Sequence, residues 1–121
     1  MSEFKFSHRD HLRLAWDVVE RNGANLAPAI VGETLRALAA VHGDAGKYNE
    51  TLTRFWVGVV THVRTVHPEA GGFEAALAAE PHLLDSSLPF RHWSREALAG
   101  GRERWVEPDL LALPLLEKPT S

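Results

Sequence analysis

The 121-residue sequence contains no cysteine. This absence excludes disulfide bonds, thiolate nucleophiles, iron–sulfur clusters and cysteine-ligated zinc. Long apolar runs are missing as well, and none approaches the ~20 residues that a membrane-spanning helix needs. Residues 1–5 also lack the apolar core of a signal peptide. We therefore expect a cytoplasmic protein with no membrane partner.

Positive charge is scarce too, because the sequence has 13 Lys and Arg but 16 Asp and Glu, which gives a formal net charge of −3. Arg102 and Arg104 form only a short local patch, so we expect no nucleic-acid partner. Nucleotide-binding and hydrolase motifs such as the P-loop, GxSxG and HExxH are absent from the sequence. The seven histidines are the main side chains available for binding a metal or moving a proton near neutral pH.

The apolar residues recur with a helical period, which predicts an all-α fold. Ser7 and Asp10 form a capping-box pattern at the start of the first helix, and Gly23 ends it. A second helix is expected to begin near Pro28, which is tolerated in a first turn, and to end at Gly43 in the left-handed conformation.

The third predicted helix is the longest, covering residues 48–67 and stopped by Pro68. Its many valines would also suit a strand, but its length and its 3.6-residue period favour a helix. After it we expect a short helix over 73–79, a loop with a turn or two of helix over 82–90, and a helix from Ser94 towards Trp105 that is interrupted at 100–101.

These elements predict one domain, residues 1–121, built as a compact bundle of three to four main helices over residues 1–105. Residues 106–121 have too many prolines for a helix and too many leucines for a free tail. We expect this extended C-terminal arm to lie across the bundle or across a partner subunit.

Antiparallel packing would gather one group of polar side chains at a single end of the bundle. Short loops place the start of the first helix beside the end of the second and the start of the third. The candidate site residues at that end are His8, His11, His42, Tyr48 and Glu50. His8 and His11 are three residues apart, so both rings would lie on one face of their helix.

Two imidazoles and a carboxylate form a ligand set typical of divalent transition metals such as Fe, Mn, Zn or Cu. The predicted metal ligands are His8, His11 and Glu50, with His42 as an alternative. Without a metal, paired imidazoles beside a carboxylate are suited to acid–base catalysis, for which the candidate catalytic residues are His8, His11, Tyr48 and Glu50.

Simpler roles compete with both interpretations. A histidine in a first turn can be partly exposed, and His42 in a last turn would suit the helix dipole. By helical angle, Glu50 falls opposite the apolar stripe, where it would form an exposed ion pair with Arg54. The site therefore requires the third helix to contact protein on two sides.

Three motifs carry a resemblance to other proteins. They are FSHRDHL at residues 6–12, KYNETLT at 47–53 and WVEPDL at 105–110. The chain resembles over nearly its whole length a family of small, all-helical bacterial proteins of unknown function. This resemblance implies a site at His8, His11, Tyr48 and Glu50, but it implies no reaction.

Two classes of function follow, and the sequence leaves open whether the protein is an enzyme. The first is a small metal-dependent or histidine-based acid–base enzyme that acts on an unknown small molecule, with Tyr48 or Thr51 supporting the ligands or contacting the substrate. The second is a non-enzymatic helical interaction module without metal, a homodimer that forms through the C-terminal arm and Trp105.

Overall fold

The computed structural model describes residues 6–43, 45–69 and 71–113. Over these residues the protein is all-helical, which confirms the predicted fold class. The α-helices are α1 (His8–Asn22), α2 (Ala27–Val41), α3 (Glu50–Val66), α4 (Phe73–Ala79) and α5 (Arg95–Gly100), and the short 3-10 helices are η1 (Ala45–Lys47), η2 (Pro81–Leu84) and η3 (Leu88–Arg91). No described helix is both long enough and apolar enough to cross a membrane.

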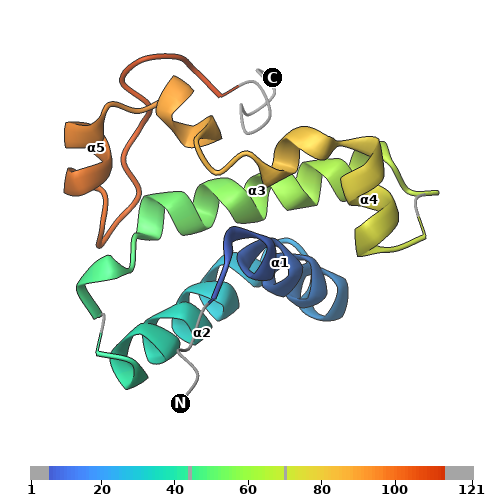
Figure 1. Cartoon of the computed structure of the whole chain (residues 1–121), viewed down its shortest axis with the longest axis horizontal. Coiled ribbons are helices and arrows are strands. Elements are labelled where there is room, and N and C mark those ends of the chain that lie inside the picture. The colour runs from blue at the N-terminus through green and yellow to red at the C-terminus, as the bar shows by residue number, and fades with distance from the viewer. Residues whose placement is uncertain (1–5, 44, 70, 114–121) are drawn as a thin grey trace.

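Helix α3 runs through the middle of the molecule, with α1 and α2 on one side and α5 with the segments around it on the other (Figure 1). Helix α4 lies beside the end of α3 and contacts α1 through Phe73 and Trp16. The buried residues of α3 therefore point in several directions and include Phe55 and Val57. Trp93, which is 0% exposed, packs edge-on against Phe55 with ring centroids 5.5 Å apart. The requirement that this helix contact protein on two sides is met.

Helix α1 begins as the sequence predicts. The Ser7 hydroxyl accepts from the Asp10 amide at 3.2 Å, while the Asp10 carboxylate accepts from the Ser7 amide at 2.9 Å. Leu12 and Ala15 are buried on its inner face. Because the capping box fixes the first turn, it also fixes the positions of His8 and His11 within that turn and the next.

Helix α3 begins two residues later than predicted, because Asn49 is its N-cap. The Asn49 side-chain oxygen accepts from the Leu52 amide at 3.0 Å, and its amide nitrogen donates to the Leu98 carbonyl at 2.9 Å. Tyr48 therefore precedes the helix, and Glu50 is its first residue.

The fifth helix ends at Gly100, at the interruption expected at 100–101, and residues 101–105 form no further helix towards Trp105. The chain turns here because the Gly101 carbonyl accepts from both the amide of Thr51 at 3.0 Å and its hydroxyl at 2.8 Å. A side chain at Gly101 would collide with the Thr51 hydroxyl and lie 2.8 Å from Val106. Tertiary contacts with α3 thus end α5.

The described part of the C-terminal arm, residues 106–113, forms no helix and packs on its own chain. The Trp93 indole donates to the Val106 carbonyl at 3.0 Å, and the Leu110 amide donates to the His92 carbonyl at 2.8 Å. Leu113 is buried in the core. Residues 106–113 therefore lie on the bundle of their own chain, the first of the two expected locations. Contact with a partner subunit stays a prediction, and residues 114–121 lie outside the described residues.

Candidate functional site

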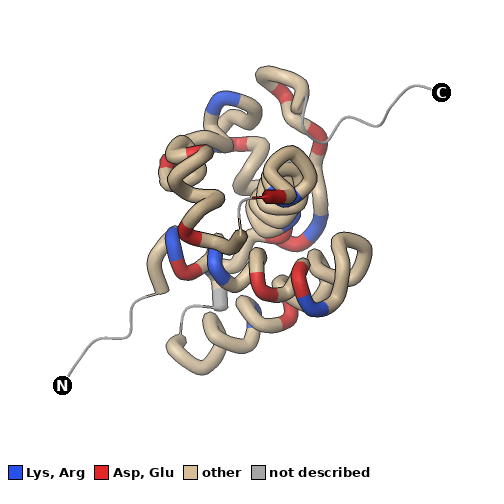
Figure 2. The backbone as a smooth tube through the Cα atoms, turned by 90° about the vertical axis from the view of Figure 1, so that its right-hand side faces the viewer, with Lys and Arg blue, Asp and Glu red and all other residues tan. Residues whose placement is uncertain are grey.

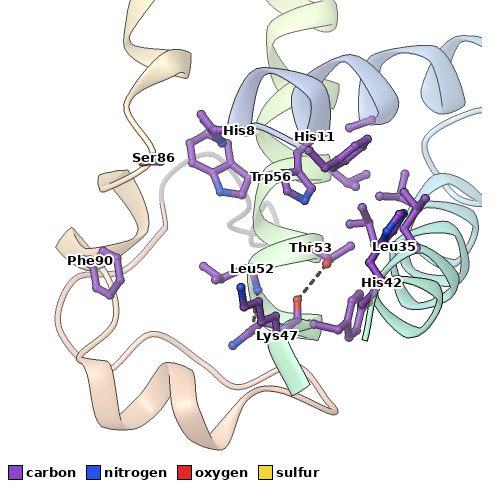
Figure 3. Close-up of a pocket in the computed structure, with 18 residues that line it drawn as sticks. His8, His11, Leu35, His42, Lys47, Leu52, Thr53, Trp56, Ser86 and Phe90 are labelled. Atoms are coloured by element: carbon purple, nitrogen blue, oxygen red, sulfur yellow. Dashed lines mark hydrogen bonds between the residues drawn. The ribbon is translucent and has the colours of Figure 1, made fainter. Parts of the chain in front are cut away.

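A cavity of about 520 Å³ lies where α1, α2 and α3 meet (Figure 3). Its wall comes from the first turns of α1, the second half of α2 and the first turns of α3, with Ser86 and Phe90 closing one side. Most of its lining is apolar, including Leu35, Leu52 and Trp56. The cavity is therefore at the end of the bundle where antiparallel packing predicts a site.

Four of the five predicted site residues line this cavity, namely His8, His11, His42 and Tyr48. Glu50, the fifth, is not part of the wall. Tyr48 precedes α3, and His42 follows the last residue of α2. The structure thus brings the imidazole groups and Tyr48 to one cavity, whereas the Glu50 carboxylate lies outside the wall and bonds only the Tyr48 hydroxyl among these residues.

His8 is held in one orientation by two neighbours. Its Nε2 donates to the Leu83 carbonyl at 2.7 Å, because a carbonyl oxygen can only accept. Its ring packs against Trp56 with centroids 4.4 Å apart. The carbonyl therefore selects the tautomer of neutral His8 in which Nδ1 is the hydrogen-bond acceptor.

His11 is half-buried beside the Phe6 ring, which meets it edge-on at 4.6 Å. Burial lowers the pKa of His11 below its usual 6.5, and the nearby His8 lowers it further. A hydrogen bond with the Ser7 backbone and the charge of Asp10 act in the opposite direction but are outweighed. His11 is consequently neutral at pH 7, when its ring has one nitrogen able to accept a proton.

Glu50 is buried and bound by three side chains. Its Oε1 accepts from the Tyr48 hydroxyl at 2.5 Å and from Arg36 at 3.2 Å, while Oε2 accepts from Arg54 at 2.6 Å. Burial raises the pKa of Glu50, but hydrogen bonds from Tyr48 and Arg54 and both guanidinium charges outweigh it, so the pKa lies below 4.5. The expected partner Arg54 is correct, whereas the expected exposure is wrong because Glu50 is only 8% exposed.

Tyr48 links the cavity to this ion-pair cluster. Its ring packs under the Arg36 guanidinium at 4.7 Å, and burial and the Glu50 hydrogen bond raise the pKa of its hydroxyl above 10.0. Gly32 makes room for that hydroxyl, since a Cβ there would lie 2.8 Å from it. The phenol is therefore protonated at neutral pH and firmly positioned.

Within residues 6–43, 45–69 and 71–113, no group of three or more His, Asp or Glu side chains is arranged to hold a metal ion. His8 uses Nε2 for Leu83, and Glu50 uses both oxygens for Tyr48 and the arginines. The His8, His11 and Glu50 set is thus not assembled around one point, and metal binding stays a prediction.

Of the two residues expected to support the ligands or contact the substrate, Tyr48 lines the cavity and Thr51 does not. Thr51 is 0% exposed, and its hydroxyl bonds Gly101, Arg104 and Val106. The lining also includes polar residues that are not among the predicted site residues, namely Lys47, Asn49, Thr53 and Ser86. Only Thr53 lies in a regular α-helix, so its position relative to Trp56 on the helix could have predicted that it faces the cavity. The other three lie outside α-helices, where the helical period predicts nothing.

No family model, no curated protein and no solved structure matches this chain. The resemblance of residues 6–12 and 47–53 to small helical proteins therefore stays a prediction.

Proposed function

We propose that the cavity binds a small, mainly apolar molecule and that His11 acts on it as a neutral general base without a metal. The observation that supports this proposal is the half-buried imidazole of lowered pKa in the wall of a cavity of about 520 Å³. A general base works best when its pKa lies near the working pH, and the lowered pKa keeps His11 unprotonated and ready to accept a proton at pH 7.

The size and lining of the cavity support a particular class of ligand. Small-molecule sites usually measure roughly 300–1,000 Å³ and combine apolar walls with a few polar groups. Leu35, Leu52 and Trp56 supply apolar contacts, and the nearby polar groups include His11 and the Thr53 hydroxyl. This favours an aliphatic or aromatic ligand with one or two polar groups.

The chemistry of this site follows from two differently placed imidazoles. His11 would accept a proton from the ligand, which requires the acidic group to reach its ring. His8 would orient the ligand through Nδ1, because Leu83 occupies Nε2. Tyr48 would supply a fixed aromatic wall, with its hydroxyl hydrogen committed to Glu50.

Hydrolysis of p-nitrophenyl acetate tests for an accessible neutral imidazole without knowledge of the natural substrate. We expect the wild-type protein to hydrolyse this ester and His11→Gln to lose most of the rate. The matched control is His82→Gln, which removes an exposed histidine outside the cavity. A rate that is unchanged in His11→Gln contradicts the proposed base.

The metal-dependent version has its own experiment. Dialysed protein is titrated with Zn²⁺, Mn²⁺, Fe²⁺ and Cu²⁺ by calorimetry. Saturable binding that disappears in both His8→Gln and His11→Gln, while persisting in His82→Gln, would replace the metal-free proposal by a metal-dependent one. Binding that survives in both cavity variants would not concern this site.

A second candidate function is favoured by an exposed apolar segment. Leu110 and Leu111 in the arm are 60% and 58% exposed, although Leu113 nearby is buried. We propose as the alternative that these leucines form the contact of a non-enzymatic homodimer. Sedimentation analysis tests it: a dimer that dissociates in Leu110→Ser/Leu111→Ser supports this function, and a wild-type monomer at high concentration contradicts it.

A further inference from the structure

A second cavity, of about 960 Å³, lies beside the first and shares Tyr48 with it. Its wall combines the second half of α2 with η1 and with the loop after α5. Three arginines face it, Arg36, Arg102 and Arg104, against a single acidic residue, Glu103. Figure 2 shows basic and acidic residues interspersed along the backbone, so three arginines around one cavity are a local feature.

Arg36 is positioned before any ligand binds. Its Nη2 donates to Glu50 at 3.2 Å, and its guanidinium packs over the Tyr48 ring at 4.7 Å. The side chain nevertheless remains 53% exposed. A guanidinium has five N–H donors, so the bond to Glu50 leaves several of them for a ligand.

Arg102 and Arg104 project from a loop whose backbone is tied to α3. The Arg102 carbonyl accepts from the Glu50 amide at 2.8 Å, and the Arg104 carbonyl accepts from the Thr51 hydroxyl at 3.0 Å. Both residues are exposed, and neither forms an ion pair with a carboxylate of the described residues. The Arg102 guanidinium lies beside Gly46, where a Cβ would be 3.6 Å away.

The charges around this cavity do not cancel. Glu50 is shared by Arg36 and Arg54, so these three side chains together carry one net positive charge. Arg102, Arg104 and Glu103 together carry a second net positive charge. Two uncompensated positive charges match a dianion.

We propose that this second cavity binds the phosphate group of a small molecule through Arg36, Arg102 and Arg104. Planar guanidinium groups bind tetrahedral oxyanions with paired N–H···O hydrogen bonds, which strengthens both affinity and geometric selectivity. Gly46 and Gly100 also line this cavity and add no side chains to its wall. This phosphate site shares only Tyr48 with the cavity that contains His11, and it does not depend on the proposed role of His11 as a base.

The experiment is calorimetric titration of the full chain with inorganic phosphate at low ionic strength, with acetate as a monoanionic comparison. We expect saturable 1:1 binding of phosphate that is tighter than that of acetate. Arg102→Gln and Arg104→Gln should each weaken it by about tenfold, the usual effect of losing a hydrogen bond to a charged group. The matched control is Arg21→Gln, which removes the same charge from the last turn of α1 and should leave binding unchanged.

Three results would overturn the proposal. One is the absence of saturable phosphate binding in the millimolar range. Another is equal weakening in Arg21→Gln, which would indicate attraction by overall charge. The third is tight binding of a single-stranded oligonucleotide that phosphate does not displace, which would indicate a nucleic-acid contact instead. Circular dichroism of each variant confirms that lost binding does not reflect lost folding.

Discussion

The Tyr48 hydroxyl donates to Glu50 Oε1 across 2.5 Å, and this bond connects the wall of the first cavity to a buried carboxylate. Glu50 also binds Arg36 and Arg54, so the three side chains share one carboxylate as their partner. Tyr48 belongs to both cavities, so a ligand in either of them would contact the same phenol ring.

Replacing Glu50 by Gln should destabilise the fold by about 1–2 kcal/mol at pH 7. A hydrogen bond to a charged group contributes roughly 1.5–3 kcal/mol, and solvent screens the half-exposed arginines. Because the pKa of Glu50 is lowered in the folded state, its contribution is complete above pH 4.5 and is lost as the pH falls through the folded pKa. Urea denaturation of both proteins should show a difference that shrinks on acidification, and a difference independent of pH would contradict this.

His11 should titrate below pH 6.5 in the folded protein. Burial is the main cause, and a neutral imidazole loses less hydration than a charged one. Stability linked to His11 is therefore complete above pH 6.5 and declines as the pH falls towards its folded pKa. NMR of the imidazole Cε1–H signal measures the midpoint, and the signal missing from His11→Gln identifies it. A midpoint above 6.5 would remove the basis for the proposed base.

Two adjacent glycines should respond oppositely to alanine. Gly101→Ala should destabilise by roughly 1–3 kcal/mol, the usual effect of overpacking, because a Cβ there collides with the Thr51 hydroxyl. Gly100→Ala meets no atom within 4 Å and ends a helix, so it should be neutral or stabilise by up to about 1 kcal/mol. Thermal denaturation of both variants checks this, and equal effects would show that α5 does not end through contact with Thr51.

His67 should titrate above 6.5, because its Nε2 bonds the Glu80 carboxylate at 2.7 Å and this bond favours the charged imidazolium. A raised pKa means that the pair contributes most below pH 6.5 and is lost as the pH rises through the folded pKa. In Glu80→Gln the His67 midpoint should move down towards 6.5, as measured by NMR. An unchanged midpoint would show that Glu80 is not the cause.

Local signals in the sequence account for the parts of the fold that were predicted correctly. The Ser7–Asp10 capping box, Gly72 before residues 73–79 and Pro81 after them act within a few residues, and the helices begin and end there as expected. Asn49 is also a local signal, because Asn before an apolar run is a common N-cap. The apolar pattern alone places the start of the helix at Tyr48, which is two residues too early.

Long-range contacts account for what could not be predicted. The acceptor for His8 is the Leu83 carbonyl, 75 residues along the chain, and a backbone carbonyl carries no sequence signal. Glu50 has the helical angle of an exposed residue but is buried, because Tyr48 and the loop after α5 cover that side of α3. Its separation from the histidines follows from the same arrangement.

The bonds from the start of α3 to the loop after α5 have a consequence for the order of folding. The Glu50 and Thr51 amides, which no α-helix can satisfy internally, donate to the carbonyls of Arg102 and Gly101. These partners are about fifty residues later in the chain, so during synthesis α3 emerges long before its first turn can be completed. Both cavities depend on that turn through Tyr48, and we expect them to take shape in one of the last steps of folding.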